Sequence, residues 1–184
     1  MLRLQDNPSM IWPLSAKLAE IELPWSVAYC KPRQEKALAN DLTQREIPYF
    51  LPMLLRETSS GGRRRRNLYP LFSSYLFFAG GERERLAALR TERIVHIIDV
   101  AETDQAQLRQ EITSLEIALR SCPESIELHP RLVAGVRVRI TSGPMKDVEG
   151  IILQTQKKRK LLLGVSVLGV GATVEIHADL VGLE

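Results

Sequence analysis

The chain has 184 residues, of which 45% are hydrophobic and 26% charged, and its formal net charge is +3. This length suits one domain or two small ones, and the composition excludes wholesale disorder and fibrous repeats. The longest uncharged stretches, residues 68–81 and 161–174, are shorter than the roughly 20 apolar residues of a membrane-spanning helix. No continuous apolar signal segment opens the sequence, so we expect a cytoplasmic protein without membrane contact.

The aromatic residues are confined to the first part of the chain. All ten Trp, Tyr and Phe residues lie at or before Phe78, and five of them lie between Tyr69 and Phe78. A chain with one well-mixed core would not usually divide in this way. The distribution therefore predicts two differently built modules.

The first module opens with residues 1–23, which have no clear period and contain Pro8 and Pro13. We expect them to form a partly disordered extension in which Trp12 can dock. Period-two alternation over residues 25–29 predicts a strand with one buried face. Leu38 and Leu42 lie four residues apart, which predicts a helix over residues 34–45. A second strand is predicted over residues 49–54.

Small, flexible residues at positions 58–62 predict a loop, and four arginines follow it directly. The apolar run 68–78 is long enough for one buried strand, which would place the arginines at a hairpin tip. Period two would then set Tyr69, Tyr75 and Phe77 on one face of that strand and Phe72 and Phe78 on the other. Two readings stay open, because these rings can be covered on both faces or can line an apolar patch for a partner.

The next elements are predicted from apolar spacing. Residues 82–90 form a short charged helix with Leu86 and Leu89 inward, and residues 94–98 form a strand. The clearest helix spans residues 104–122. Its apolar stripe recurs at steps of four and three and consists of Leu108, Ile112, Leu115, Leu119 and Cys122.

Beyond Pro123 the texture of the sequence changes. Residues 124–130 predict a linker, and short strands follow over residues 136–140, 150–153, 161–168 and 174–176. Strands separated by turn signals at roughly ten-residue spacing are typical of a small antiparallel barrel. Its core must be aliphatic, and without rings to stack on bases it favours a protein partner over RNA. The basic run Lys157–Lys160 predicts a hairpin tip.

Catalysis finds little support in the sequence. It contains no phosphate-binding loop, dinucleotide fingerprint or nucleophile elbow. The three histidines lack neighbours at metal-ligand spacing, and His96 is expected to be a core or edge residue. Cys30 and Cys122 are expected to be free thiols. We therefore expect no catalytic residues, no metal, no cofactor and no enzymatic activity.

Two groups of residues resemble NusG-type transcription elongation and antitermination factors. Residues 25–27, Gln34-Glu35, residues 49–52 and residues 70–78 resemble the N-terminal, or NGN, domain of that family. Residues 138–144, closing at 150–152, resemble its KOW motif, with Gly143, Pro144 and Gly150 at the motif positions. The resemblance implies an α+β fold, in which an antiparallel NGN-type sheet flanked by helices is linked to a small SH3-like barrel. The implied segments are an extension (1–23), the NGN-type domain (24–122), a linker (123–129) and the KOW barrel (130–184).

This resemblance also implies a function. The N-terminal domain would bind RNA polymerase, and the barrel would recruit a ribosomal protein or termination factor, so that a monomeric, non-enzymatic factor suppresses pausing or termination. The residues expected to grip a coiled coil of the polymerase's largest subunit are Tyr49, Leu71, Phe72 and Tyr75. The arginines expected to contact the DNA backbone are Arg63, Arg64, Arg65 and Arg66, although a solvated loop is the alternative for this run.

Departures from the family pattern are also visible. Ser73-Ser74 replaces a Pro-Gly pair, Met145 replaces a Phe, and Asp147 replaces a Gly, although Asp tolerates left-handed backbone. The extension and the long helix fit a specialised, RfaH-like paralogue. The alternative function is an RNA-binding, ribosome-associated KOW protein.

Overall fold

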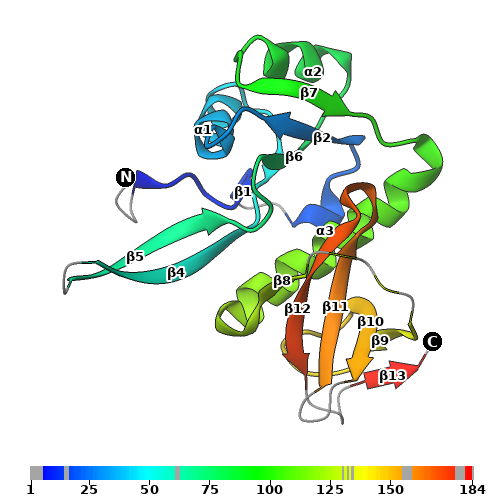
Figure 1. Ribbon diagram of the computed structural model, residues 1–184. Helices are drawn as coiled ribbons and strands as arrows, with labels where there is room; N and C mark the ends of the chain where they lie inside the picture. The colour runs from blue at the N-terminus through cyan, green and yellow to red at the C-terminus, as the bar shows by residue number, and fades with distance from the viewer. Residues whose placement is uncertain are drawn as a thin grey trace. The chain divides into compact units, whose positions relative to one another are not determined.

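The computed structural model describes residues 6–14, 17–60, 63–129, 131, 133, 135–154, 159–176 and 181–183. The chain divides into two compact units, Met1–Gln105 and Ala106–Glu184, which we call unit 1 and unit 2 (Figure 1). Each unit contains its own antiparallel sheet. The fold is α+β, as the sequence predicted.

Unit 1 is built on a five-stranded antiparallel sheet with the strand order β1-β3-β6-β2-β7. Its strands are β1 (Ile11–Trp12), β2 (Trp25–Cys30), β3 (Tyr49–Phe50), β6 (Tyr75–Ala79) and β7 (Ile94–Ile98). The helices α1 (Glu35–Gln44) and α2 (Glu82–Leu89) contribute Leu38, Leu42 and Ala88 to one core with this sheet. From the sheet, Ala28, Leu76 and Phe78 enter the same core. We call this side of the sheet the helix face.

The extension is part of unit 1. β1 pairs with β3 and sets Trp12 opposite Tyr49, and a short 3-10 helix, Leu18–Glu20, follows. Ile11 and Leu18 are buried, and Trp12 packs against the core of the helix face. The prediction of partial disorder is therefore wrong for the described residues 6–14 and 17–23, because their apolar side chains extend the core of the sheet.

The aromatic run does not form the single strand that was predicted. β5 (Arg63–Pro70) ends at a proline, residues 71–74 turn, and β6 begins at Tyr75. Proline cannot donate a strand hydrogen bond, and Ser74 adopts a left-handed φ of 68°, which breaks the extended backbone. The face assignment of Tyr69 and Phe72 relative to β6 is therefore wrong.

The predicted short helix forms as α2, but its orientation differs from the expectation. Leu86 and Leu89 are 46% and 41% exposed, whereas Ala88 is buried. A small residue brings the helix close to the sheet, so the inward positions are not the leucines. The four charged residues of α2 all precede Leu86, so the helix has no apolar stripe that would identify its inward side.

Unit 2 contains most of α3 (Gln105–Ser121) and a six-stranded antiparallel sheet with the order β13-β9-β10-β11-β12-β8. Its strands are β8 (Glu127–His129), β9 (Arg137–Ile140), β10 (Glu149–Gln154), β11 (Arg159–Val165), β12 (Val170–Ile176) and β13 (Val181–Leu183). Val138, Ile140, Leu161, Leu163 and Val174 are fully or almost fully buried. This is the small SH3-like barrel with an aliphatic core that the sequence predicted.

The division between the units falls at a different place from the predicted linker. From Ala106 onward α3 belongs to unit 2, where Ser114 Oγ accepts a hydrogen bond from Glu149 N–H at 3.1 Å. Ser121 Oγ donates to the Pro144 carbonyl at 2.9 Å. Residues 127–129 of the expected linker form β8 and pair with β12. The polar residues of α3 and the strand propensity of β8 join both segments to the barrel.

Candidate functional site

Aromatic side chains gather on the side of the unit 1 sheet opposite the helix face. The register pairs Tyr29 of β2 with Tyr75 of β6 and His96 of β7, and it pairs Phe50 of β3 with Phe77 of β6. Because side chains alternate along a strand, these residues lie on the face opposite Ala28, Leu76 and Phe78. With Phe72, which precedes β6, they form what we call the aromatic face: Tyr29, Phe50, Phe72, Tyr75, Phe77 and His96.

The rings of the aromatic face contact each other in two groups. The Phe77 ring centroid lies 6.1 Å from Phe50 and 6.4 Å from Phe72, with the Phe72 ring edge-on. The Tyr29 ring centroid lies 5.2 Å from Tyr75 and 5.0 Å from His96. Separations of this size are typical of favourable aromatic pairs.

The two groups differ in exposure. Phe50, Phe72 and Phe77 are at most 3% exposed, whereas Tyr29 and Tyr75 are half-buried and His96 is exposed. β7, which carries His96, is an edge strand of the sheet. The aromatic face therefore has a buried end that anchors it and an accessible end, Tyr29, Tyr75 and His96, that can contact a partner.

The structure separates the four residues predicted to bind polymerase. Tyr75 is at the accessible end, and Phe72 is buried beside Phe77. Leu71 is buried, and its N–H donates to the Pro52 carbonyl at 2.7 Å. Tyr49 cannot be a contact residue, because it is fully buried on the helix face and its hydroxyl donates to the Ser9 carbonyl at 3.1 Å.

Sequence reasoning missed Tyr29 and His96 as site residues. The alternation in β2 was visible, and it places Tyr29 on the same face as Trp25 and Val27. The pairing of β2 with both β6 and β7 brings the three rings together. That register depends on tertiary structure, so no signal local to residues 29 or 96 could have found it.

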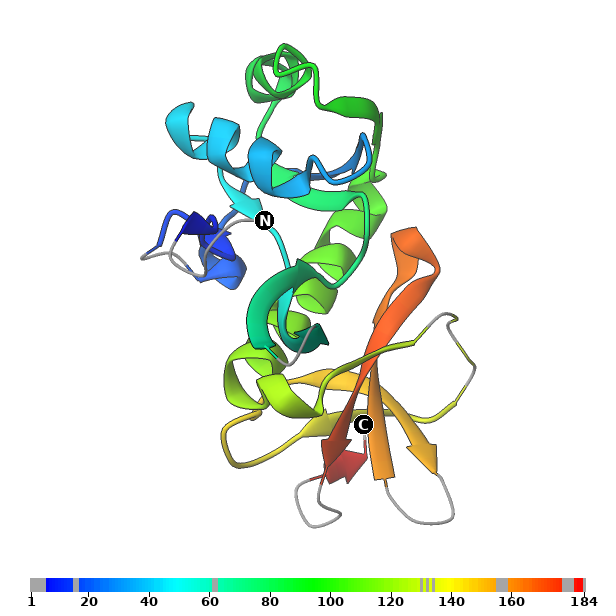
Figure 2. The ribbon, with the colours of Figure 1, turned by 60° about the vertical axis from the view of Figure 1, so that its left-hand side comes forward.

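The arginine run lies within β5 instead of at a loop tip. β4 (Met53–Ser60) and β5 form a two-stranded ribbon that extends away from the five-stranded sheet (Figures 1 and 2). Arg64 and Arg66 are exposed, and Arg64 lies 3.9 Å from Glu57 as an exposed ion pair. The side chains of Arg63 and Arg65 lie outside the described part of the chain. The described part of the ribbon thus carries two exposed arginines, and guanidinium groups have the planar donor geometry that suits phosphates and carboxylates.

A half-buried lysine holds the base of this ribbon. Lys36 Nζ donates to the Leu68 carbonyl at 2.5 Å and to Asn7 Oδ1 at 2.6 Å, so it joins α1, β5 and the extension. Burial lowers the pKa of Lys36, and the adjacent Glu35 carboxylate partly opposes this by raising it. The ammonium group therefore donates its hydrogen bonds to a backbone carbonyl and an amide oxygen inside unit 1.

In unit 2 the residues that resemble a KOW motif form a tight turn between β9 and β10. Gly143 and Asp147 have φ of 80° and 69°, and Asp147 N–H donates to the Ile140 carbonyl at 2.8 Å. This confirms that Asp147 tolerates the left-handed backbone where the family has Gly. A Cβ on Gly150 would lie 2.6 Å from the Leu162 carbonyl oxygen, so this glycine permits the close approach of β10 and β11. The Lys157 and Lys158 tip lies outside the described residues, and Lys160 pairs with Glu127 at 2.6 Å.

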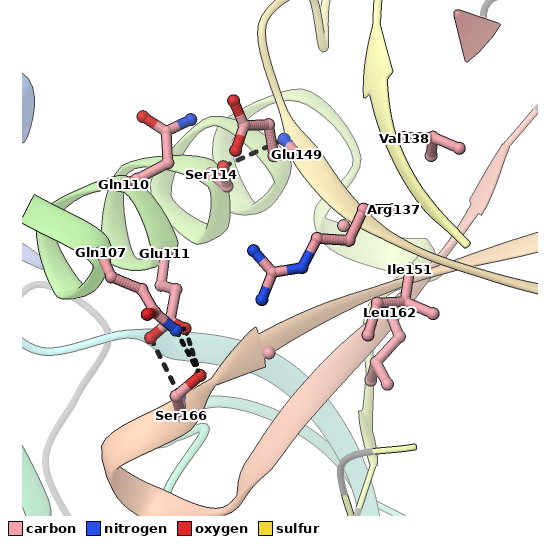
Figure 3. Close-up of a pocket in the computed structure, with 12 residues that line it drawn as sticks. Gln107, Gln110, Glu111, Ser114, Arg137, Val138, Glu149, Ile151, Leu162 and Ser166 are labelled. Atoms are coloured by element: carbon pink, nitrogen blue, oxygen red, sulfur yellow. Dashed lines mark hydrogen bonds between the residues drawn. The ribbon is translucent and has the colours of Figure 1, made fainter. Parts of the chain in front are cut away.

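A cavity of about 300 Å³ lies in unit 2 between α3 and strands β9 to β11. Arg137, Ile151 and Leu162 line it in one cross-strand row, and the Arg137 guanidinium points into it (Figure 3). On its helix side, Glu111 accepts hydrogen bonds from the N–H and the hydroxyl of Ser166. These contacts fasten α3 to the barrel, and the mixed lining contains no aromatic ring.

Over the residues that the structure describes, no group of three or more His, Cys, Asp or Glu side chains could hold a metal ion. In the same residues, no helix combines the length and the apolar character needed to cross a membrane. Cys30 is buried and Cys122 is half-buried, and both are free thiols.

Residues 23–116 match the family model described as "Transcription termination factor nusG". The matched segment covers more than half of the chain. The chain therefore belongs to the NusG family. This membership makes it a transcription elongation factor by family.

Among solved structures, this NusG-family chain is similar to one described as "Domain interaction in Thermotoga maritima NusG". The identity is 15% and the TM-score is 0.40, over 89% of this chain and 98% of that chain. It is also similar to one described as "Crystal Structure of MjSpt4:Spt5 complex conformation B". There the identity is 15% and the TM-score 0.27, over 86% of this chain and 95% of that chain. No curated protein matches the sequence.

Proposed function

We propose that this chain binds RNA polymerase through the accessible end of the aromatic face. The observation that carries the proposal is the row of Tyr75, Tyr29 and His96, which leaves aromatic surface accessible on an otherwise buried sheet face. Accessible rings with polar tips are typical of protein interfaces. Family resemblance indicates a coiled coil of the polymerase's largest subunit as the contact.

The roles of the predicted residues are refined accordingly. Tyr75 contacts polymerase together with Tyr29 and His96. Phe72 and Leu71 are buried and act on this surface only indirectly, Phe72 through its contact with Phe77, and Tyr49 has no part in it. Removing Phe72 therefore weakens polymerase binding indirectly, through the shape of the surface.

The ribbon of β4 and β5 adds a DNA contact in this proposal. Exposed Arg64 and Arg66 support it, since guanidinium groups bind phosphates through paired hydrogen bonds. Such contacts position a protein on nucleic acid without reading its sequence. The ribbon would thus strengthen attachment to a transcribing complex beside the polymerase contact.

The barrel of unit 2 recruits a second partner, which we propose to be a ribosomal protein or a termination factor. The absence of aromatic residues after Phe78 supports a protein partner over RNA, because base stacking needs rings. Lys160, one of the basic residues at the predicted tip, is already paired with Glu127. The mechanism is bridging by a cytoplasmic monomer without catalysis. By favouring the closed, elongating polymerase, it suppresses pausing or termination.

We also propose that the chain is a specialised, RfaH-like antitermination paralogue. The structured extension with β1 and the 17-residue helix α3 support this. Chromatin occupancy of the tagged protein tests it. Restriction to a few operons is expected, and occupancy across all transcribed genes would contradict it.

Pull-down of core RNA polymerase with the full chain tests the polymerase contact. The Tyr75→Ala and His96→Ala variants should each retain less polymerase than the unaltered chain. Tyr69→Ala is the matched control, because Tyr69 is a half-buried tyrosine of β5 outside the aromatic face. Equal retention by all three variants would contradict the proposed surface.

A further inference from the structure

The turn between Phe72 and Tyr75 is the least regular part of the aromatic face. Ser74 has a φ of 68°, a left-handed conformation that glycine adopts freely and serine rarely. A residue held in such a region persists only when its surroundings determine it. The contacts that hold Ser74 therefore also fix where Phe72 and Tyr75 lie.

Ser74 is held on both sides of its backbone. Its N–H donates to Glu35 Oε1 at 2.6 Å, and its carbonyl accepts a hydrogen bond from Cys30 N–H at 2.7 Å. Glu35 is only 6% exposed, although it belongs to a residue type that is seldom buried. A buried carboxylate that accepts a backbone N–H makes a charge-assisted hydrogen bond, about twice as strong as a neutral one.

We propose that Glu35 is a positioning residue for polymerase binding. Its carboxylate holds Ser74 in the left-handed conformation, and the turn then presents Tyr75 beside Tyr29. This inference rests on the proposed binding of polymerase by the aromatic face. Glu35 itself contacts no partner, because it lies under the turn and is buried.

The position of Glu35 predicts how replacing its carboxylate changes the affinity for polymerase. If the turn is formed in only a fraction of molecules, the apparent dissociation constant rises by the inverse of that fraction. Replacing the carboxylate by an amide keeps an acceptor but loses the charge. Glu35→Gln should therefore open the turn more often, by about fivefold, and weaken polymerase binding by up to the same factor.

The Ser74→Gly variant provides a second, independent test of the role of Glu35. Glycine adopts the left-handed conformation without strain, so the turn of this variant depends less on Glu35. The loss caused by Glu35→Gln should accordingly be smaller in the Ser74→Gly background than in the serine chain. A purely structural contact of Glu35 elsewhere in unit 1 would give the same loss in both backgrounds.

The experiment compares four full-length chains: the unaltered chain, Glu35→Gln, Ser74→Gly and the double variant. Two readouts are measured: affinity for core RNA polymerase, and amide hydrogen exchange at Ser74 and Cys30 without polymerase. Glu84→Gln is the matched control, because Glu84 Oε2 also accepts a backbone N–H, that of Gly81 at 2.9 Å, at the start of α2 and not in this turn.

The expected result is faster exchange at both amides and weaker polymerase binding for Glu35→Gln, with both changes reduced by Ser74→Gly and absent in Glu84→Gln. The proposal is overturned if Glu35→Gln behaves like Glu84→Gln, or if its effect is equal in both backgrounds. A Tyr75→Ala chain with unaltered affinity would overturn the aromatic surface and the positioning role together. Weak binding by Tyr75→Ala with normal binding by Glu35→Gln would overturn the positioning role alone.

Discussion

The five-stranded sheet of unit 1 carries aromatic rings on both faces, whereas the barrel of unit 2 is closed with Val, Ile and Leu. On the helix face Tyr49 and Phe78 are covered by α1, and on the other face Phe50 and Phe77 are covered while Tyr75 is not. The aliphatic barrel leaves no comparable ring accessible. Aromatic rings therefore supply both buried packing and accessible surface in unit 1, whereas the core of the barrel in unit 2 is aliphatic.

The largest expected effect is a loss of stability in unit 1 alone, caused by a substitution in its core. Phe77→Ala removes a fully buried ring and should lower the free energy of unfolding of unit 1 by about 3–5 kcal/mol. Both tryptophans, Trp12 and Trp25, lie in unit 1, so tryptophan fluorescence during denaturation measures this unit alone. Val136→Ala, at a 60% exposed position in unit 2, is the control and should leave the fluorescence transition in place. Equal shifts in the two variants would contradict separately built cores.

The reactivity of the two thiols also compares the units, since unit 1 contains Cys30 and unit 2 contains Cys122. Burial raises the pKa of the Cys30 thiol to about 12, and the Glu35 carboxylate adds to this effect. Since the thiolate is the reactive form, a disulfide reagent at pH 8 should label Cys30 about a thousandfold more slowly than a thiol with the ordinary pKa of 9.0. Half-buried Cys122 should be labelled before Cys30. Mass spectrometry of the labelled chain over time provides the measurement. Equal labelling rates would contradict the closed helix-face core.

Cys30 should also make the free energy of unfolding of unit 1 depend on pH in the alkaline range. Because its folded-state pKa is raised from 9.0 to about 12, the folded state holds the proton more tightly than the unfolded state does. Its contribution to stability is complete below pH 9 and is lost progressively as the pH rises toward 12. Cys30→Ala should flatten this part of the stability curve, measured by denaturation at each pH. An unchanged slope would show that Cys30 does not cause it.

A glycine tests the packing of the barrel in turn. In Gly171→Ala the new Cβ would lie 2.4 Å from the Leu163 carbonyl oxygen, so β11 and β12 must move apart. Overpacking of this kind should cost about 1–3 kcal/mol in unit 2. Gly169→Ala is the contrast, because that site is open and only its left-handed φ of 66° opposes alanine. Denaturation of each variant, followed by the amide NMR signals of unit 2, measures the loss of stability. A greater loss of stability for Gly169→Ala than for Gly171→Ala would contradict the packing argument.

The smallest expected effect concerns the ribbon. Replacing both Arg64 and Arg66 by Ala should reduce the salt dependence of DNA binding by about two counterions, roughly one per lost phosphate contact. Binding to a bubble-containing duplex at several salt concentrations measures this slope. Arg90→Ala, an exposed arginine at the end of α2, is the control. The same slope in all three proteins would indicate that these arginines are solvated on the ribbon and contact no DNA.

Much of the fold could be predicted because its signals are local. The apolar stripe of α3, the alternation of β2 and the spacing of the barrel strands are written in consecutive residues, and they produced the two-module description. The breaks were harder to see. Pro70 and the left-handed Ser74 divide the aromatic run, and Ser74 departs from the glycine that would have marked a turn.

The candidate site was predicted only in part for a different physical reason. Tyr75 was found because it lies in a family motif, whereas Tyr29 and His96 become its neighbours only through strand register. Tyr49 was assigned to the site from its place in the sequence. Because side chains alternate along β3, Tyr49 lies on the helix face, opposite to Phe50, and its hydroxyl donates to the Ser9 carbonyl.

Site-specific photo-crosslinking tests the central claim most directly. A photo-reactive amino acid is placed at position 75 at the accessible end of the aromatic face, and at position 69 on the ribbon as the control. Each full-length protein is irradiated with core RNA polymerase. We expect a crosslink from position 75 to the largest polymerase subunit that exceeds the crosslink from position 69. A crosslink from position 69 with none from position 75 would contradict it.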